Sequence, residues 1–124
     1  MANSLPTSLP AVSDDALKEM SRELWGWRIN CRSDKSLDDL AQMVNKVVQG
    51  WINYYGRFYK SKLYPLLQRI NEYLVRWAKR KYKRLRGHTR RAKRWLVRVA
   101  RREPTLFAHW RLGVRPEGWT MGAE

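Results

Sequence analysis

The sequence predicts an all-α fold, a small bundle of about four helices with one long basic helix and irregular termini. Three observations favour this class. Apolar residues recur at intervals of three and four, which is the period of an α-helix with one buried face. No stretch alternates apolar and polar residues as a half-buried strand does. A length of 124 residues, with 44% hydrophobic residues and seven Trp, is sufficient for one compact core.

The first helix is expected to begin at Ser13, after a tail over residues 1–12 that contains prolines. The Ser13 hydroxyl can cap free amides, and Asp14 and Asp15 suit the positive end of a helix. Four residues at helical spacing define the inner face of this helix: Leu17, Met20, Leu24 and Trp27.

The second helix follows a polar segment, and Ser36 with Asp39 three residues later resembles a capping box. Its apolar stripe is continuous over several turns and consists of Leu37, Leu40, Val44, Val47, Trp51 and Tyr54. Gly56 is a suitable terminator because glycine is common just after a helix.

The third helix is predicted from about Ser61 to Arg86, with Pro65 tolerated in its first turn because amides there lack internal partners. Its buried stripe consists of Leu63, Leu66, Leu67, Ile70, Leu74 and Trp77. The predicted helix would be roughly 39 Å long, so we expect part of it to project beyond the core. Thr89 is expected to cap a fourth helix that ends before Pro104 and has Ala92, Trp95, Leu96 and Val99 inside. The predicted helical domain thus spans residues 13–113, followed by an irregular tail over residues 114–124.

Charge is unevenly distributed along the chain. Lys and Arg number 26 against 11 Asp and Glu, a formal net charge of +15. Residues 1–56 have six basic and seven acidic side chains, whereas residues 57–124 have twenty basic and four acidic ones. Polyanions are the natural partners of such a protein, and the second half of the chain is where we expect one to bind.

Basic residues recur at helical spacing on the third and fourth predicted helices. Arg69, Arg76, Arg80 and Lys83 share one face of the third, and Arg91, Arg94, Arg98 and Arg101 share one face of the fourth. Two such adjacent faces can form a groove that follows a phosphate backbone. The alternative is a solvated face without a ligand. Like charges at this spacing destabilise a helix, so polyanion binding is favoured over that alternative.

The run from Trp51 to Tyr59 is rich in aromatic residues and ends next to Lys60. Trp51, Tyr54 and Phe58 continue the buried stripe, and we assign them to the core. Tyr55 and Tyr59 are the better candidates for stacking on unpaired bases, each stack contributing about 1–3 kcal/mol.

Enzymatic, membrane and export signatures are missing from the sequence. It contains no Gly-rich phosphate loop, no paired carboxylates in an apolar setting and no Ser, His and Asp set in a plausible context. Cys31, His88 and His109 do not form a metal-ligand pattern, and His109 is assigned a structural or surface role. We therefore predict a cytoplasmic non-enzyme without cofactor, metal, small-molecule substrate or membrane partner.

Two segments of the chain resemble a known family. Residues 40–86 contain GWINYYG at Gly50 to Gly56, and residues 101–113 contain Phe107, His109 and Trp110. Together they resemble the maturase-specific domain at the C-terminal side of group II intron-encoded reverse transcriptases, a helical region continuous with the polymerase thumb. The resemblance covers nearly everything from Leu9 to Gly113.

The resemblance implies that the chain binds unspliced group II intron RNA and helps it reach its self-splicing fold, with any magnesium chemistry belonging to the RNA. The family's basic residues correspond here to Arg57, Lys60, Arg76, Lys79, Arg80, Lys81, Lys83 and Arg84. Polymerase fingers and palm and a Cys-rich endonuclease are absent, so reverse transcription and DNA cleavage are not expected.

Other roles stay open at this point. The domain could dock onto a separately encoded reverse transcriptase core through exposed hydrophobic residues among Trp25, Trp27, Leu112 and Trp119. It could also be a non-functional remnant of a decayed intron-encoded protein. General DNA binding is a further possibility, which predicts equal affinity for duplex DNA and structured RNA at matched salt.

Overall fold

The computed structural model describes residues 14–116, and that range contains helices and turns but no strand. The elements in chain order are α1 (Asp14–Gly26), a 3-10 turn η1 (Ile29–Cys31), α2 (Leu37–Trp51), a π-helical segment η2 (Ile52–Gly56), α3 (Arg57–Lys81), a 3-10 turn η3 (Lys83–Leu85), α4 (Thr89–Arg102) and α5 (Ala108–Leu112). The predicted all-α bundle is confirmed.

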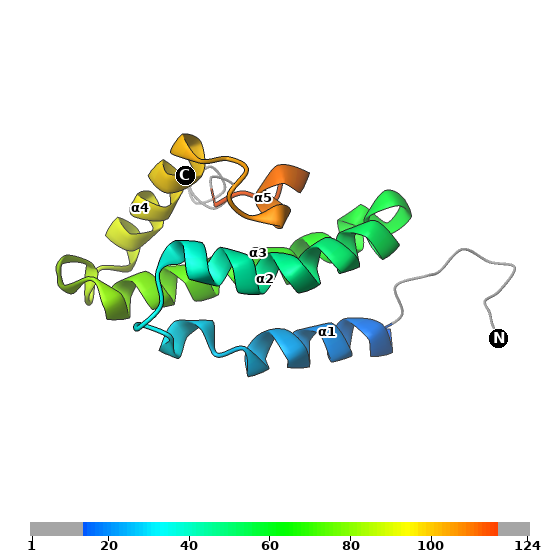
Figure 1. The fold of residues 1–124 in the computed structure, drawn as a ribbon, viewed down its shortest axis with the longest axis horizontal. Helices are drawn as coiled ribbons and strands as arrows, with labels where there is room; N and C mark the ends of the chain where they lie inside the picture. Colours follow the sequence, from blue (N-terminus) through cyan, green and yellow to red (C-terminus); the bar gives the residue numbers. More distant parts are fainter. Residues whose placement is uncertain (1–13, 117–124) are drawn as a thin grey trace, which may run out of the picture.

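The helices are arranged around α3 (Figure 1). The chain reverses direction after α2, so that α3 runs back behind α2, and α1 lies along the opposite side from α4. From the far end of α3, α4 leads away at a steep angle, and α5 returns toward α2. All five helices contribute to one hydrophobic core, represented by Leu24, Val44, Leu74, Leu96 and Trp110.

The beginnings of α1 and α2 are largely as predicted. In α1, Met20 and Leu24 are buried, while Leu17, and Trp27 just after the helix, pack against the core as partly buried side chains. The predicted cap Ser13 and the tail before it lie outside the described residues. The capping box of α2 is confirmed because Ser36 Oγ accepts from the Asp39 amide and Asp39 Oδ2 accepts from the Ser36 amide, both at 3.1 Å. The hydrogen bond from the Ser36 backbone amide to the carboxylate, followed by a smaller contribution from the Ser36 side chain, lowers the pKa of Asp39.

The apolar stripe of α2 was predicted correctly only over its first part. Leu40 and Val44 are buried, but Tyr54 is 58% exposed, so its assignment to the core was wrong. The π-helical segment Ile52–Gly56 has a wider hydrogen-bonding period than an α-helix, and it rotates the residues that follow Trp51 away from the expected face. Ile52 and Tyr55 pack against the core instead.

Both predicted ends of the third helix were wrong. It begins at Arg57 instead of Ser61, so Pro65 lies inside the helix and not in its first turn. Pro65 is on the exposed face, where water can satisfy the carbonyl that loses its helical partner. Buried residues run from Leu63 to Ala78, so this stretch of α3 packs along the core.

Helix α3 ends at Lys81 because the side chain of Tyr82 packs against the core. Tyr82 has extended backbone angles, and its ring lies 5.9 Å from the ring of Trp77 and 5.4 Å from that of Trp95. Leu85 in η3 is also buried, which holds the turn against the core. Aromatic packing therefore ends α3 at Lys81, before the predicted end at Arg86.

Helix α4 has the predicted inner face, with Ala92, Leu96 and Val99 buried and Trp95 half-buried. The predicted cap was wrong. The N-cap residue is His88, which makes no side-chain cap hydrogen bond, and Thr89 is the first helical residue. The Thr89 hydroxyl instead accepts a hydrogen bond from Lys79 Nζ at 2.6 Å.

Helix α5 was not predicted, and two asparagines hold its segment in place. Asn45 of α2 donates to the carbonyl of Leu106 at 2.9 Å and accepts from the amide of Ala108 at 2.8 Å. Asn71 of α3 is fully buried and bonds to His109 and Trp110. His109 therefore has a structural role, one of the two roles predicted for it.

Candidate nucleic-acid interface

The solvent face of α4 consists almost entirely of arginine. Apart from Thr89, every exposed side chain of this helix is an arginine: Arg90, Arg91, Arg94, Arg98, Arg101 and Arg102. The opposite face of α4 consists of small and branched apolar residues and is buried. The sequence has no Asp or Glu between Glu72 and Glu103, so α4 contains no acidic side chain to offset these charges. The four arginines predicted to share a face are all exposed.

The predicted basic face of α3 also reaches solvent. Arg69, Arg76 and Arg80 are exposed, on the side of α3 opposite its buried stripe. Arg69 donates to Ser21 Oγ of α1 at 3.4 Å, and the Arg76 guanidinium lies 5.8 Å from the centre of the Tyr73 ring. These contacts are weak and surface-exposed, so they do not prevent either side chain from meeting a ligand.

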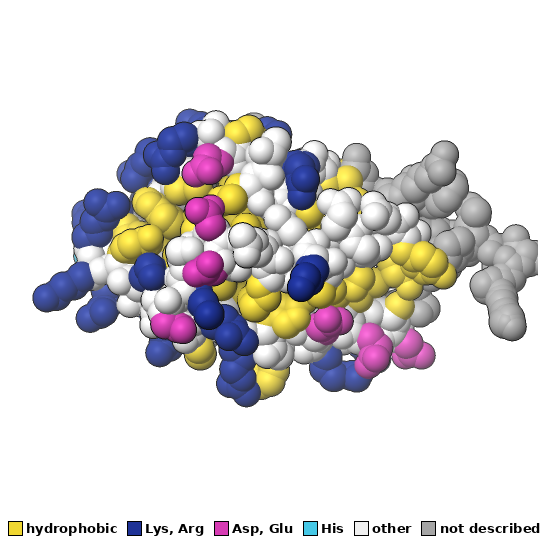
Figure 2. Space-filling view, viewed as in Figure 1, with side chains coloured by type: hydrophobic (Ala, Val, Ile, Leu, Met, Phe, Trp, Pro, Cys, Tyr) yellow, Lys and Arg dark blue, Asp and Glu magenta, His cyan; other side chains and the backbone are white. Residues whose placement is uncertain are grey.

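The turn between α3 and α4 adds further positive charge. Lys83, Arg84 and Arg86 are exposed there. Lys83 was predicted on the outer face of the third helix, but α3 ends at Lys81 and Lys83 belongs to η3. Figure 2 shows Lys and Arg side chains gathered at this end of the molecule, around the α3–α4 turn and along α4.

Two other predicted lysines make hydrogen bonds within the protein. Lys81 Nζ donates to the carbonyls of Ser33 and Lys35, both at 3.0 Å, and lies 5.6 Å from the centre of the Trp77 ring. Lys79 donates to the Thr89 hydroxyl at the start of α4. Both side chains are partly buried, and their contacts join α3 to its neighbours.

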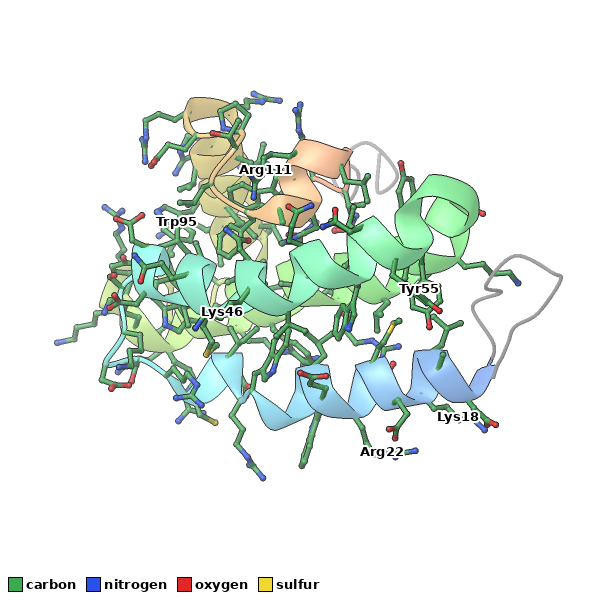
Figure 3. All side chains as sticks on the ribbon, turned by 45° about the vertical axis from the view of Figure 1, so that its right-hand side comes forward. Lys18, Arg22, Lys46, Tyr55, Trp95 and Arg111 are labelled. Atoms are coloured by element: carbon green, nitrogen blue, oxygen red, sulfur yellow. The ribbon has the colours of Figure 1, made fainter. Side chains whose placement is uncertain are left out.

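Tyr55, one of the two predicted stacking residues, lies apart from this basic surface (Figure 3). Tyr55 is half-buried, its ring centre is 4.6 Å from that of Tyr54, and burial raises the pKa of its hydroxyl. Figure 3 shows Tyr55 and Trp95 at opposite ends of the bundle. The side chains of Arg57, Tyr59 and Lys60 fall outside the described part of the structure.

An aromatic cluster at the start of α4 was missed as a candidate site. The rings of Trp77, Tyr82 and Trp95 lie within 6.3 Å of one another, with Trp77 buried and the other two half-buried. A signal was present in the sequence, because Trp95 follows Arg91 by four residues and precedes Arg98 by three. That spacing puts all three side chains side by side on a helix.

Other kinds of site have little support within residues 14–116. No group of three or more His, Cys, Asp or Glu side chains there could hold a metal ion. None of the helices in this range has the length and apolarity needed to cross a bilayer. Shallow hollows lie on α1 beside Trp25 and at the start of α2 beside Lys46.

The family model for the group II intron maturase-specific domain matches residues 17–96, which are 80 of the 124 residues. The chain belongs to the group II intron maturase-specific domain family. No curated protein and no solved structure matches it. The resemblance to this family is thereby confirmed, with a match that includes GWINYYG but ends before the second segment, residues 101–113.

The match places most of the basic surface inside the maturase-specific domain. It runs from Leu17 in α1 to Leu96 in α4, so it includes Arg91, Arg94 and Trp95. The second half of the arginine face, from Arg98 to Arg102, follows the end of the match and continues the same helix.

Proposed function

We propose that this maturase-specific domain binds group II intron RNA through α4, the α3–α4 turn and the outer face of α3, and so assists folding and splicing of the intron. The observation that supports this most directly is the solvent face of α4, where six exposed arginines occur without an acidic residue on the helix. Phosphate contacts of this kind supply affinity, while RNA shape and a few base contacts supply selectivity.

The energetics of α4 favour a polyanionic ligand over a merely solvated surface. Arg90, Arg94, Arg98 and Arg102 are four residues apart, and like charges at that spacing repel one another. Arg90 and Arg91 also lie in the first turn, next to the positive end of the helix dipole. Bound phosphates would relieve both effects.

We extend the proposal to further predicted contacts and to the kind of activity. The additional RNA-binding residues are Arg57, Lys60, Arg69, Arg76, Lys79, Arg80, Lys81, Lys83 and Arg84, with Tyr55 and Tyr59 as stacking residues. Lys79 and Lys81 would have to exchange their internal hydrogen bonds for phosphate contacts. The domain would act as a cytoplasmic splicing cofactor, with the transesterification chemistry supplied by the RNA.

The test is a titration of group II intron RNA at several salt concentrations, with an unrelated structured RNA of equal length as reference. If about six to ten phosphates are engaged, affinity should fall by roughly 10³- to 10⁵-fold between about 50 and 200 mM salt. Arg91→Gln, Arg94→Gln and Arg98→Gln combined should weaken binding on the order of 100-fold near 100 mM salt and reduce the salt slope by about 3.

The matched control removes the same charge from other surfaces. Lys18, Lys46 and Lys62 are exposed on α1, α2 and the first half of α3, and their combined substitution by Gln should affect affinity much less. Equal effects of the two triple variants would show that only net charge matters. An affinity for intron RNA that does not change with salt would refute the proposal.

Docking onto a separately encoded reverse transcriptase core is a second candidate function, favoured by the 60% exposure of Trp25 on α1. It predicts that the domain co-purifies with a polymerase core and that Trp25→Ser abolishes this association. Tight binding of intron RNA by the isolated domain, without any association with a polymerase core, would refute it.

A further inference from the structure

The aromatic cluster at the junction of α3 and α4 is buried on one side and open to solvent on the other. Trp77 is fully buried, and its indole N–H donates to the carbonyl of Arg32 at 2.8 Å. Tyr82 and Trp95 pack against it with ring centres 5.9 and 6.3 Å away, and both are half-buried. Parts of these two rings therefore form the surface where α4 leaves α3.

Trp95 also differs from the buried tryptophans in its hydrogen bonding. The indole N–H groups of Trp77 and Trp110 both donate to internal oxygens, as buried indoles usually do. Among the described residues, no acceptor is present for the indole N–H of Trp95. Trp95 thus retains both an accessible part of its ring and an unused donor.

The surroundings of Trp95 are strongly basic on the α4 side. Arg91, Arg98 and Arg102 lie four residues before, three after and seven after Trp95, and all three are exposed. Figure 2 shows hydrophobic surface at this end of the molecule, with Lys and Arg on its α4 side and Asp and Glu on its α2 side. A phosphate backbone would follow the basic side, and a base next to it would reach the rings.

We propose that Trp95 and Tyr82 form a stacking site for an unpaired nucleotide of the bound RNA, with Arg91 and Arg98 contacting the adjacent phosphates. The inference rests on the proposed RNA binding and adds a preference for unpaired over fully paired RNA. Trp25 is more exposed, but the Arg28 guanidinium already lies 4.7 Å from the centre of its ring. Exposed Asp15, Glu19 and Glu23 on the same helix would also repel phosphates.

The experiment compares two RNA hairpins with equal numbers of phosphates, one fully paired and one with an internal loop of unpaired nucleotides. Wild-type protein should bind the looped hairpin more tightly. Trp95→Leu keeps an apolar side chain but removes the stacking surface, and it should reduce the affinity for the looped hairpin by about 5- to 150-fold, since each stack contributes about 1–3 kcal/mol. Its affinity for the paired hairpin should change little.

Trp25→Leu is the matched control, because it makes the same substitution at a more exposed tryptophan outside the basic surface, and it should leave both affinities unchanged. The inference would be overturned if Trp95→Leu changed both affinities equally or changed neither. It would also be overturned if Trp25→Leu lost the preference for the looped hairpin. None of these results would contradict the proposed RNA binding itself. If wild-type protein binds neither hairpin nor intron RNA, the proposed function itself fails.

A second measurement uses unaltered protein and so does not depend on the folding of a variant. The looped hairpin is made with 5-iodouridine at its unpaired positions, irradiated in complex with the protein, and the cross-linked peptide is identified by mass spectrometry. Cross-links at Trp95 or Tyr82 support the inference. Cross-links confined to Trp25, Tyr54 or Tyr55 overturn it.

Discussion

Asn71 is the single residue that best explains how the end of the chain is held against the bundle. Its side chain is fully buried on α3, and its Oδ1 lies 2.7 Å from His109 Nε2 and 2.8 Å from Trp110 Nε1. Its amide nitrogen donates to Gln68 Oε1 at 2.6 Å and to the carbonyl of Val114 at 3.2 Å. One polar side chain thus satisfies buried groups of His109, Trp110 and Val114, and it also bonds to the partly exposed Gln68.

Replacing Asn71 by Ala should lower the free energy of unfolding by roughly 2–4 kcal/mol, because it leaves buried donors on His109 and Trp110 unsatisfied. Urea denaturation measures the change. Gln68→Ala removes a more exposed amide from the same network and serves as the control. A loss no greater than that of the control would contradict the role assigned to Asn71.

His109 should make the protein sensitive to acid. Complete burial lowers the pKa of His109 from 6.5 to about 3, and its Nδ1 has no hydrogen-bond partner. The unfolded chain binds this proton near pH 6.5 and the folded chain does not, so the full contribution to stability is present above pH 6.5. It is lost progressively as the pH falls toward 3, by an amount on the order of several kcal/mol.

The measurement is the free energy of unfolding at pH 7 and at pH 4. His109→Phe should show a smaller difference between these conditions than the wild type, even if it is less stable at both. His88→Gln changes an exposed histidine and should retain the wild-type difference. Identical pH dependence in all three proteins would show that His109 is not the acid-sensitive group.

At the scale of the helices, the local signal for the α2 capping box was reliable, but the Thr89 cap predicted for α4 was wrong, and features that depend on distant contacts were not predicted. The capping box of α2 could be predicted because its two partners, Ser36 and Asp39, are only three residues apart in the sequence. The end of α3 depends on Tyr82 packing against Trp95, and α5 depends on Asn45 and Asn71, which are distant in the sequence. Period-based reasoning also failed at Tyr54, where the helix changes to a π-helical turn.

The capping box provides a prediction for α2. Ser36→Ala removes the acceptor of the Asp39 amide and should cost about 1 kcal/mol of unfolding free energy. Ser33→Ala, in the same loop, keeps the carbonyl that Lys81 uses and should have little effect. Thermal and urea denaturation of both variants measure the difference, and equal stability of the two would argue against a contribution from the cap.

At the scale of the whole molecule, positive charge is concentrated in the second half of the chain and at the α3–α4 end of the bundle (Figure 2). The arginines of α4 were predictable as a basic face because helical spacing alone determines which residues share a side. Tyr82 and Trp95 were not predicted as a site, because their partial exposure depends on the turn between α3 and α4. The family, in contrast, was evident from short motifs whose order along the chain is enough to identify it.

The hydrogen bonds by which Asn45 and Asn71 hold the α5 segment also determine where the chain can be shortened. The family match ends at residue 96, yet Phe107, Ala108, Trp110 and Val114 belong to the same buried core as α2 and α3. Truncation at residue 102 would uncover this core and leave Asn45 and Asn71 without most of their partners, whereas truncation at residue 116 would keep every described contact. We expect the longer fragment to melt cooperatively and the shorter one to aggregate, so the independently folding unit is larger than the segment that defines the family.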